Sequence, residues 1–231
     1  MASDEPGQRS PVAGGETPPR FSALLTGPAV IPGLSIETAD DAVPLARALI
    51  DGGLSVLEVT LRTDCAIEAA KRIIAEVPGA VLGIGTVTRP EEFEEVMDAG
   101  AQFAVSPGLT PALGDAALAS GLPYLPGVST PSEVMAAREF GFFEMKLYPA
   151  MLSGGPKALM AMAPVFADVK FCPTGGVTAA NLKDFLKLGN VFGVGGTWVA
   201  PAELVAGHRW DAITALAAEA AGIAQAAVKT G

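Results

Sequence analysis

The sequence predicts a single closed (β/α)₈ barrel, an α/β fold in which eight parallel strands alternate with helices. From about Pro28 onward, short apolar runs alternate with longer stretches of helical period, and Gly, Pro, Ser or Thr separate them. There are eight such units over roughly 180 residues, which fits a barrel of typically about 250 residues. A doubly wound open sheet is the main competing fold. It usually has fewer units, and no GxGxxG follows the first strand of this chain.

The expected strands are short, apolar and bounded by turn-forming residues. They are Ala29–Leu34, Val56–Leu61, Ala80–Gly85, Phe103–Ser106, Pro123–Pro126, Phe143–Tyr148, Val169–Pro173 and Val191–Gly195. The stretches between them, such as DAVPLARALIDGG, PEEFEEVMDAG and SEVMAAREFG, open on Asp, Pro or Ser and close on Gly. These are the usual start and stop signals of helices, so each strand is followed by a helix.

The chain divides into a short extension and the barrel. Residues 1–20 are rich in Pro, Gly, Ser and Thr and lack the apolar core of a signal peptide, which predicts a disordered extension. Residues 21–231 form the expected barrel. No segment offers the ~20 unbroken apolar residues of a membrane helix, so we expect a cytoplasmic protein with no membrane partner.

Composition excludes several classes of partner and cofactor. The formal net charge of −10 argues against nucleic acid, which requires a clustered basic face. Cys65 and Cys172 are far apart and are expected to be small buried side chains. With His208 as the only histidine, a His-rich metal site is nearly excluded, and we predict no metal and no cofactor.

Charged residues interrupt two of the strands on one face. In VLEVTLR, Glu58, Thr60 and Arg62 share a face, because strand side chains alternate. The apolar residues between them should face the helices, so a carboxylate and a guanidinium point into the barrel or its mouth. Burying them is costly unless they pair or bind a ligand, which leaves open a structural Glu58–Arg62 ion pair.

The same alternation in FEMKLYP places Glu144, Lys146 and Tyr148 on the inner face. Lysine is rarely buried without a reason, and burial favours the neutral amine that Schiff-base chemistry on a ketone requires. The alternative is that Lys146 only neutralises Glu144. Lys170 is the rival amine, and we expect it at the base of the barrel.

The last two strands each end on a glycine pair, in PTGGVTAANL and GVGGTW. In barrels, the loops after strands 7 and 8 commonly bind phosphate through backbone N–H groups. The expected phosphate site consists of Thr174, Gly175, Gly176, Gly196 and Thr197.

Six blocks of the sequence together resemble the bacterial 2-keto-3-deoxy-6-phosphogluconate (KDPG) aldolase family, which includes 4-hydroxy-2-oxoglutarate aldolases. The blocks are VLEVTLRT, GIGTV, AQFAVSPGLTP, PGVSTPSE, FEMKLYPA and KFCPTGGVTAANL, in family order from about Gly27 onward. The resemblance implies a trimeric class I carbon–carbon lyase that needs no metal and forms pyruvate and glyceraldehyde 3-phosphate from KDPG.

The resemblance also assigns roles to individual residues. It implies that Lys146 forms the Schiff base and that Glu58 is the acid/base. Arg62 and Thr86 match positions that hold the pyruvyl carboxylate, and Pro107 and Tyr148 match positions that line the pocket. Thr174, Gly175, Gly176, Gly196 and Thr197 match the phosphate-binding loops.

Three departures from the family pattern bear on substrate preference. Tyr148 stands where many relatives have Phe, Thr197 stands where many have Ser, and AVIPGLSI differs from the usual first strand. The alternative substrates are 4-hydroxy-2-oxoglutarate and 2-keto-3-deoxy-6-phosphogalactonate. From other functional classes, a phosphate-binding barrel isomerase or epimerase and a non-catalytic phosphosugar-binding regulator would share the glycine loops.

Overall fold

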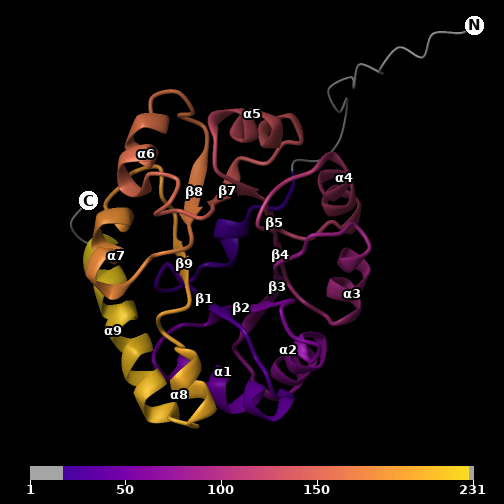
Figure 1. Ribbon diagram of the computed structural model, residues 1–231, viewed down its shortest axis with the longest axis vertical. Helices are drawn as coiled ribbons and strands as arrows, with labels where there is room; N and C mark the ends of the chain where they lie inside the picture. The colour runs from indigo at the N-terminus through magenta and orange to yellow at the C-terminus, as the bar shows by residue number, and fades with distance from the viewer. Residues whose placement is uncertain (1–17, 229–231) are drawn as a thin grey trace, which may run out of the picture.

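The computed structural model describes residues 18–228 and forms a ring of parallel strands surrounded by helices (Figure 1). The expected disordered extension falls largely on residues 1–17, outside the described part of the chain. The strands are β1 Val30–Leu34, β2 Val56–Thr60, β3 Val81–Gly85, β4 Ala104–Val105, β5 Tyr124–Leu125, β6 Gly127–Val128, β7 Glu144–Leu147, β8 Lys170–Pro173 and β9 Val194–Gly196.

Strand pairing closes the ring in two arcs. One arc has the order β5-β4-β3-β2-β1-β9, and the other has the order β6-β7-β8. Since β5 and β6 are successive halves of one barrel strand, the nine segments occupy eight strand positions. Single bridges from Phe171 to Val191 and from Thr174 to Gly195 join β8 to the last strand position. The predicted (β/α)₈ barrel is confirmed.

Two expected strands differ in their limits. The predicted strand Pro123–Pro126 is interrupted at Pro126: β5 pairs with β4, whereas β6 pairs with β7. The predicted last strand, Val191–Gly195, is observed as Val194–Gly196, with Val191 only in an isolated bridge.

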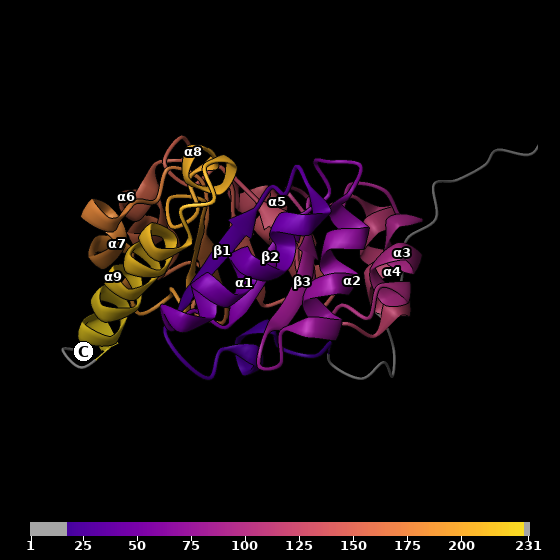
Figure 2. The same ribbon diagram turned by 90° about the horizontal axis from the view of Figure 1, so that it is seen from below.

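Helices cover the outside of the ring (Figures 1 and 2). They are α1 Ala42–Asp51, α2 Ala66–Glu76, α3 Glu92–Asp98, α4 Pro111–Ser120, α5 Pro131–Glu139, α6 Gly155–Met162, α7 Ala179–Leu186, α8 Ala202–Ala206 and α9 Trp210–Val228, with 3₁₀ turns η1 Phe21–Leu24 and η2 Ala39–Asp41. The longest helix, α9, packs against both α1 and α7 and so covers the junction between β1 and β9.

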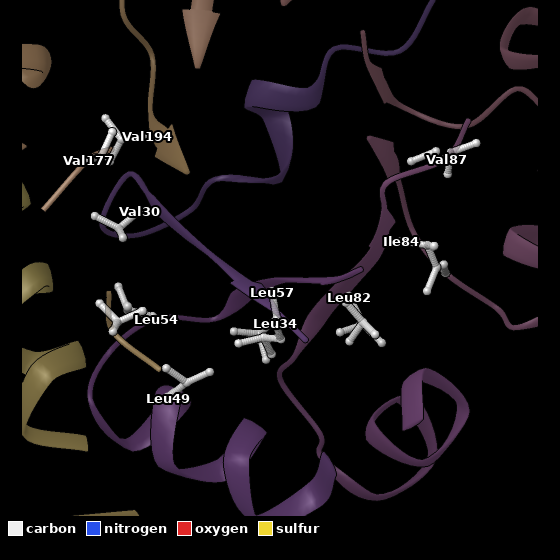
Figure 3. Packing of buried hydrophobic residues seen from close by; sticks show 14 of the residues in the cluster. Val30, Leu34, Leu49, Leu54, Leu57, Leu82, Ile84, Val87, Val177 and Val194 are labelled. Atoms are coloured by element: carbon white, nitrogen blue, oxygen red, sulfur yellow. The ribbon is translucent and has the colours of Figure 1, made fainter. Parts of the chain in front are cut away.

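Apolar side chains form two layers, as strand alternation predicts. The outer layer lies between strands and helices, where Leu34, Leu57 and Leu82 of three adjacent strands gather above Leu49 of α1 (Figure 3). The inner layer fills the lumen with Phe21, Ile31, Val56, Phe103, Val105, Leu125 and Cys172. The inner layer makes the barrel a packed core beneath its mouth, not an open pore.

The turn η1 closes the base of the barrel and lies within the ring in Figure 1. The Phe21 ring packs edge to face against the Phe103 ring, with the two ring centroids 4.8 Å apart. Next to it, Ser22 donates its backbone N–H (2.8 Å) and its hydroxyl (2.5 Å) to the Glu144 carboxylate. The buried carboxylate of Glu144 is thereby satisfied from the base. No helix within residues 18–228 has the length and apolar character needed to cross a membrane.

Candidate active site

A lysine and a carboxylate meet inside the barrel above the inner apolar layer. Lys146 of β7 and Glu58 of β2 come from strands on opposite sides of the ring, and their Nζ and Oε1 atoms are 3.3 Å apart. Lys146 is 7% exposed and Glu58 is 4% exposed. Lysine can act as a nucleophile, and the adjacent carboxylate can exchange protons with it.

The pairing differs from both structural alternatives that the sequence left open. Glu144 receives its hydrogen bonds from Ser22, so it is not the partner of Lys146 in this structure. Arg62 is exposed at the end of β2, and among residues 18–228 no ion pair of its side chain is observed. Glu58 therefore faces Lys146, while the guanidinium of Arg62 is available at the mouth.

The rival amine lies far from this pair. Lys170 is the first residue of β8, is exposed, and donates its Nζ to the Gly189 carbonyl at 2.6 Å. Because the first residues of parallel barrel strands lie at the base, its side chain is at the opposite end from the mouth.

Gly85 is a site residue that the sequence did not single out. A Cβ atom there would lie 1.9 Å from Oε1 of Glu58, so only glycine leaves room for this carboxylate. Gly83 lies two residues earlier on the same face. A Cβ atom there would lie 2.1 Å from the Phe103 ring, so this glycine likewise provides the space for that ring. The signal in the sequence was the alternation in GIGTV, which places two side-chain-free positions toward the lumen.

Tyr148 and Cys172 complete the surroundings of the lysine. The Lys146 ammonium lies 5.4 Å from the centroid of the Tyr148 ring, within the range of a cation–π contact. Cys172 is the Cα partner of Lys146 across β7 and β8. Complete burial raises the pKa of the Cys172 thiol to about 12, although the nearby Lys146 charge opposes this. The thiol is therefore neutral and unsuited to nucleophilic chemistry. The other cysteine, Cys65, is only partly buried, contrary to expectation.

Thr86 and Pro107 lie at the carboxyl ends of β3 and β4, where barrel active sites are built. Thr86 has a φ of 64°, a left-handed conformation that is rare for a β-branched residue. Such outliers concentrate at functional sites, because the surrounding structure must hold them. The loop that follows is held by Glu92, whose carboxylate accepts the N–H groups of Thr88 (2.6 Å) and Arg89 (3.0 Å).

The two glycine loops lie side by side. Thr174 bridges to Gly195, and a Cβ atom on Gly195 would lie 2.4 Å from the Thr174 hydroxyl oxygen. Gly175 and Gly176 have φ values of 97° and 78°, which other residues rarely adopt. Asn181 of α7 donates to the Gly176 carbonyl at 3.0 Å and fixes this loop.

The second loop presents Gly196 and Thr197. Gly196 is buried under the Trp198 ring, and Thr197 is exposed. The Trp198 indole N–H is buried and has no hydrogen-bond partner among the described residues. Within residues 18–228, no three His, Cys, Asp or Glu side chains are grouped as metal ligands would be.

These features define a (β/α)₈-barrel enzyme whose lumen holds an amine and a carboxylate, with glycine loops at the same mouth. The sequence model of the KDPG and KHG aldolase family matches residues 22–216. The chain is 49% identical over 199 residues to the KHG/KDPG aldolase of Escherichia coli (strain K12), covering 86% of this chain and 93% of that protein. It is 49% identical over 197 residues to the 2-dehydro-3-deoxy-phosphogluconate aldolase of Dickeya dadantii, covering 85% and 92%. This protein belongs to the KDPG/KHG aldolase family.

Solved structures support the same assignment. The KDPG aldolase of Legionella pneumophila, with pyruvate captured as a covalent carbinolamine intermediate, superposes with a TM-score of 0.84 at 44% identity, covering 87% of this chain and 97% of that one. The aldolase of Zymomonas mobilis with 3-phosphoglycerate superposes with a TM-score of 0.81 at 46% identity, covering 87% and 94%.

Proposed function

We propose that this protein is a class I aldolase that cleaves KDPG into pyruvate and glyceraldehyde 3-phosphate through a Schiff base on Lys146. The observation that carries the proposal is the buried contact of 3.3 Å between Lys146 Nζ and Glu58 Oε1. The pair lies in a chain that is about half identical to named KDPG aldolases. The carbinolamine of the Legionella relative is the first covalent intermediate that such a lysine would form.

In the first half of the reaction, Lys146 Nζ attacks the C2 ketone and forms a carbinolamine. Glu58 supplies the proton with which the C2 hydroxyl leaves as water, and an iminium remains. The positive iminium nitrogen withdraws electrons from C3. Glu58, which is now a carboxylate, takes the proton of the C4 hydroxyl. The C3–C4 bond then breaks, its electron pair moves toward the iminium, and glyceraldehyde 3-phosphate departs.

In the second half, an enamine of pyruvate remains on Lys146. Glu58 returns its proton to C3, and water hydrolyses the resulting iminium to release pyruvate. The proton set free in this hydrolysis returns to Glu58, which leaves Lys146 as the neutral amine for the next cycle. One carboxylate therefore serves as acid and base in turn. Its contact with Nζ at 3.3 Å and its burial support this role.

The remaining site residues are assigned to substrate binding. Arg62 and Thr86 would hold the pyruvyl carboxylate, and a guanidinium does so with two parallel hydrogen bonds that lysine does not reproduce. Pro107 and Tyr148 would line the pocket. Thr174, Gly175, Gly176, Gly196 and Thr197 would bind the distal phosphate through backbone N–H groups, for which the positive φ values of Gly175 and Gly176 are suited.

Trapping with borohydride tests the covalent step. Borohydride with pyruvate should reduce the imine and add a stable label to Lys146, located by peptide mass spectrometry. Lys146→Ala should abolish both the label and KDPG cleavage. Lys170→Ala is the matched control, because this exposed lysine lies at the base, and the variant should label at the wild-type rate. An unlabelled Lys146 in active protein, or near-normal cleavage by Lys146→Ala, would contradict the proposal.

Glu58→Gln tests the proton transfer. It should leave pyruvate binding largely intact and slow turnover by about 10²- to 10⁴-fold, because the amide cannot exchange the proton. Pyruvate release is followed with lactate dehydrogenase, and pyruvate binding is measured by calorimetry. An equal loss of binding and rate would instead indicate a structural role for Glu58.

A second substrate is favoured by one comparison. The E. coli relative carries both KHG and KDPG in its name, so we expect 4-hydroxy-2-oxoglutarate to be cleaved as well. A structure described as native KDPGal is less similar, at 27% identity and a TM-score of 0.78. Kinetics on these three substrates ranks them. Sugar-phosphate isomerisation without pyruvate release would instead indicate a phosphate-binding barrel isomerase or epimerase. Tight binding of KDPG without turnover would indicate a non-catalytic phosphosugar-binding regulator.

We also propose a cytoplasmic homotrimer that requires neither metal nor cofactor. The family resemblance implies the trimer and the independence from metal. Light scattering should then give about three times the chain mass of 23.4 kDa, and activity should persist after treatment with a chelator. A monomer in solution would contradict the trimer.

A further inference from the structure

Two buried hydroxyl groups lie just behind the mouth of the barrel, outside its lumen. Ser106 directly follows β4 and is 0% exposed, and Tyr124 of β5 is 3% exposed. Val105 points into the lumen, so the next side chain points outward. There Ser106 Oγ lies 2.5 Å from Tyr124 Oη. The proposed chemistry uses neither group.

The surrounding contacts fix the direction of each hydrogen bond. Ser106 Oγ is 2.6 Å from the Gly108 carbonyl oxygen, which can only accept, so the single serine hydrogen is donated there. Tyr124 must therefore donate its own hydrogen to Ser106 Oγ. The backbone N–H of Gly127 also points to this oxygen, at 3.4 Å. The serine hydroxyl thus uses its one donor and both acceptor positions.

These bonds connect the turn after β4 to the strand beside Lys146. A Cβ atom on Gly127 would lie 2.2 Å from the Pro107 carbonyl carbon and oxygen, so the turn and β6 are in direct backbone contact. Gly127 is the Cα partner of Lys146, and Lys146 donates its backbone N–H to the Pro126 carbonyl at 2.8 Å. A shift of Ser106 would therefore move the backbone on which Lys146 is aligned.

The tyrosine ring is itself held firmly. It contacts Phe93 and Phe142 edge to face, with ring centroids 5.5 and 5.2 Å away. Burial raises the pKa of the Tyr124 phenol to about 12, although the hydrogen bond with Ser106 opposes this. The phenol therefore remains a hydrogen-bond donor at any pH near neutrality.

We propose that Tyr124 and Ser106 are positioning residues of the aldolase, which hold the Pro107 turn and β6 in the geometry that Lys146 needs to form its imine. The inference rests on the proposed function. Imine formation depends on the approach of Nζ to the ketone, and small misplacements of reacting groups slow such steps severalfold or more.

Removal of each hydroxyl tests the proposal. Tyr124→Phe removes one oxygen and keeps the ring, and it should lower kcat and the rate of borohydride-trapped labelling about 3- to 10-fold. Ser106→Ala removes the shared hydroxyl and should lower both by about 10-fold or more. KM for KDPG should change less than about twofold, because the proposed carboxylate and phosphate contacts are untouched.

Thr214→Val is the matched control. It removes a hydroxyl that donates to the Ala48 carbonyl at 2.9 Å between α9 and α1, away from the mouth. This variant should lose stability and still label Lys146 at the wild-type rate per folded molecule. The double variant of Tyr124 and Ser106 adds a second readout. It should be more stable than Ser106→Ala, whose tyrosine hydroxyl lacks a partner, and yet no faster.

The outcomes separate the inference from the proposed function. Wild-type protein that is not labelled contradicts both. Labelled wild-type protein with Tyr124→Phe and Ser106→Ala at the wild-type rate per folded molecule overturns the inference alone. If Ser106→Ala does not fold, Tyr124→Phe decides the matter by itself.

Discussion

Gly85 decides where the Glu58 carboxylate can lie. The two residues are on adjacent strands and the same inner face, and the absence of a side chain on one provides the space for the carboxylate of the other. This is a steric requirement and not a chemical one, so it acts on Lys146 only through Glu58. A site built from two charged side chains thus depends on a third position that carries none.

Gly85→Ala should therefore displace the carboxylate and lower kcat by about 10²-fold or more, as expected for loss of a general acid/base. The protein should still fold, since one methyl group costs about 1–3 kcal/mol in a packed interior. KDPG cleavage and urea unfolding are measured together. Gly189→Ala is the control, because nothing lies within 4 Å of a Cβ atom there, and it should keep full activity. Full activity of Gly85→Ala would show that the Glu58 carboxylate does not need the space left by Gly85.

At this scale, strand alternation correctly predicted which side chains enter the lumen. Glu58, Glu144 and Lys146 are all buried on the inner side of their strands. Alternation does not give distances across a ring. The sequence therefore could not decide between the two ion pairs it left open, Glu58–Arg62 and Lys146–Glu144, and the pair observed is Lys146–Glu58. The partner of Glu144 is Ser22, which is 122 residues away in the chain.

Among elements, the loop between β3 and α3 depends on one carboxylate. Burial of the Glu92 carboxyl opposes its ionisation, but the N–H groups of Thr88 and Arg89 and the Arg89 guanidinium outweigh this and lower its pKa. Glu92 lies at the start of α3, where a negative charge also suits the helix dipole. The loop it fixes begins directly after Thr86, whose left-handed backbone must be maintained from outside.

Glu92→Gln should lower the free energy of unfolding by about 1–2 kcal/mol at pH 7, because hydrogen bonds to a charged acceptor are lost. A lowered pKa in the folded state means that the carboxylate stabilises the fold above its unfolded value of 4.5. This contribution is lost as the pH falls below that value, so the difference between wild type and variant should shrink toward pH 3.

Urea unfolding at a series of pH values measures this difference. Glu94→Gln, at an exposed position of α3, serves as the control and should stay close to wild type throughout. A Glu92→Gln difference that is constant with pH would mean that the carboxylate is not what stabilises the loop.

The expected elements were observed except where contacts distant in sequence set their limits. Turn residues and apolar periods placed the eight strands and the three named helical stretches to within a few residues. The interruption between β5 and β6 was missed. It falls at Pro126, between a segment paired with β4 and one paired with β7, where the Pro107 backbone, 20 positions before Gly127, closely approaches that glycine. No local pattern reports such an approach.

In the whole molecule, the contacts that close the ring lie at the base of the barrel, whereas the catalytic pair is reached from its mouth. Gly52 precedes β2 at the base, and a Cβ atom there would lie 2.4 Å from the Ala217 side chain and 2.7 Å from the Thr214 carbonyl oxygen of α9. This close approach lets α9 lie against α1 and cover the seam between β1 and β9. The mouth, with Glu58 and Lys146, is reached from the other end of the same strands.

Gly52→Ala should therefore weaken closure without altering the reaction. We expect a loss of about 1–3 kcal/mol in the free energy of unfolding, because a methyl group is forced against the backbone of α9. Labelling of Lys146 per folded molecule should stay within about twofold of wild type, since the geometry at the mouth that governs the rate is unchanged. Gly222→Ala, an exposed position on the same helix with open space around it, should instead stabilise by about 0.5–1 kcal/mol. Urea unfolding and borohydride labelling of both variants measure the two effects. Slower labelling in Gly52→Ala at unchanged stability would show that closure at the base and the geometry at the mouth are coupled.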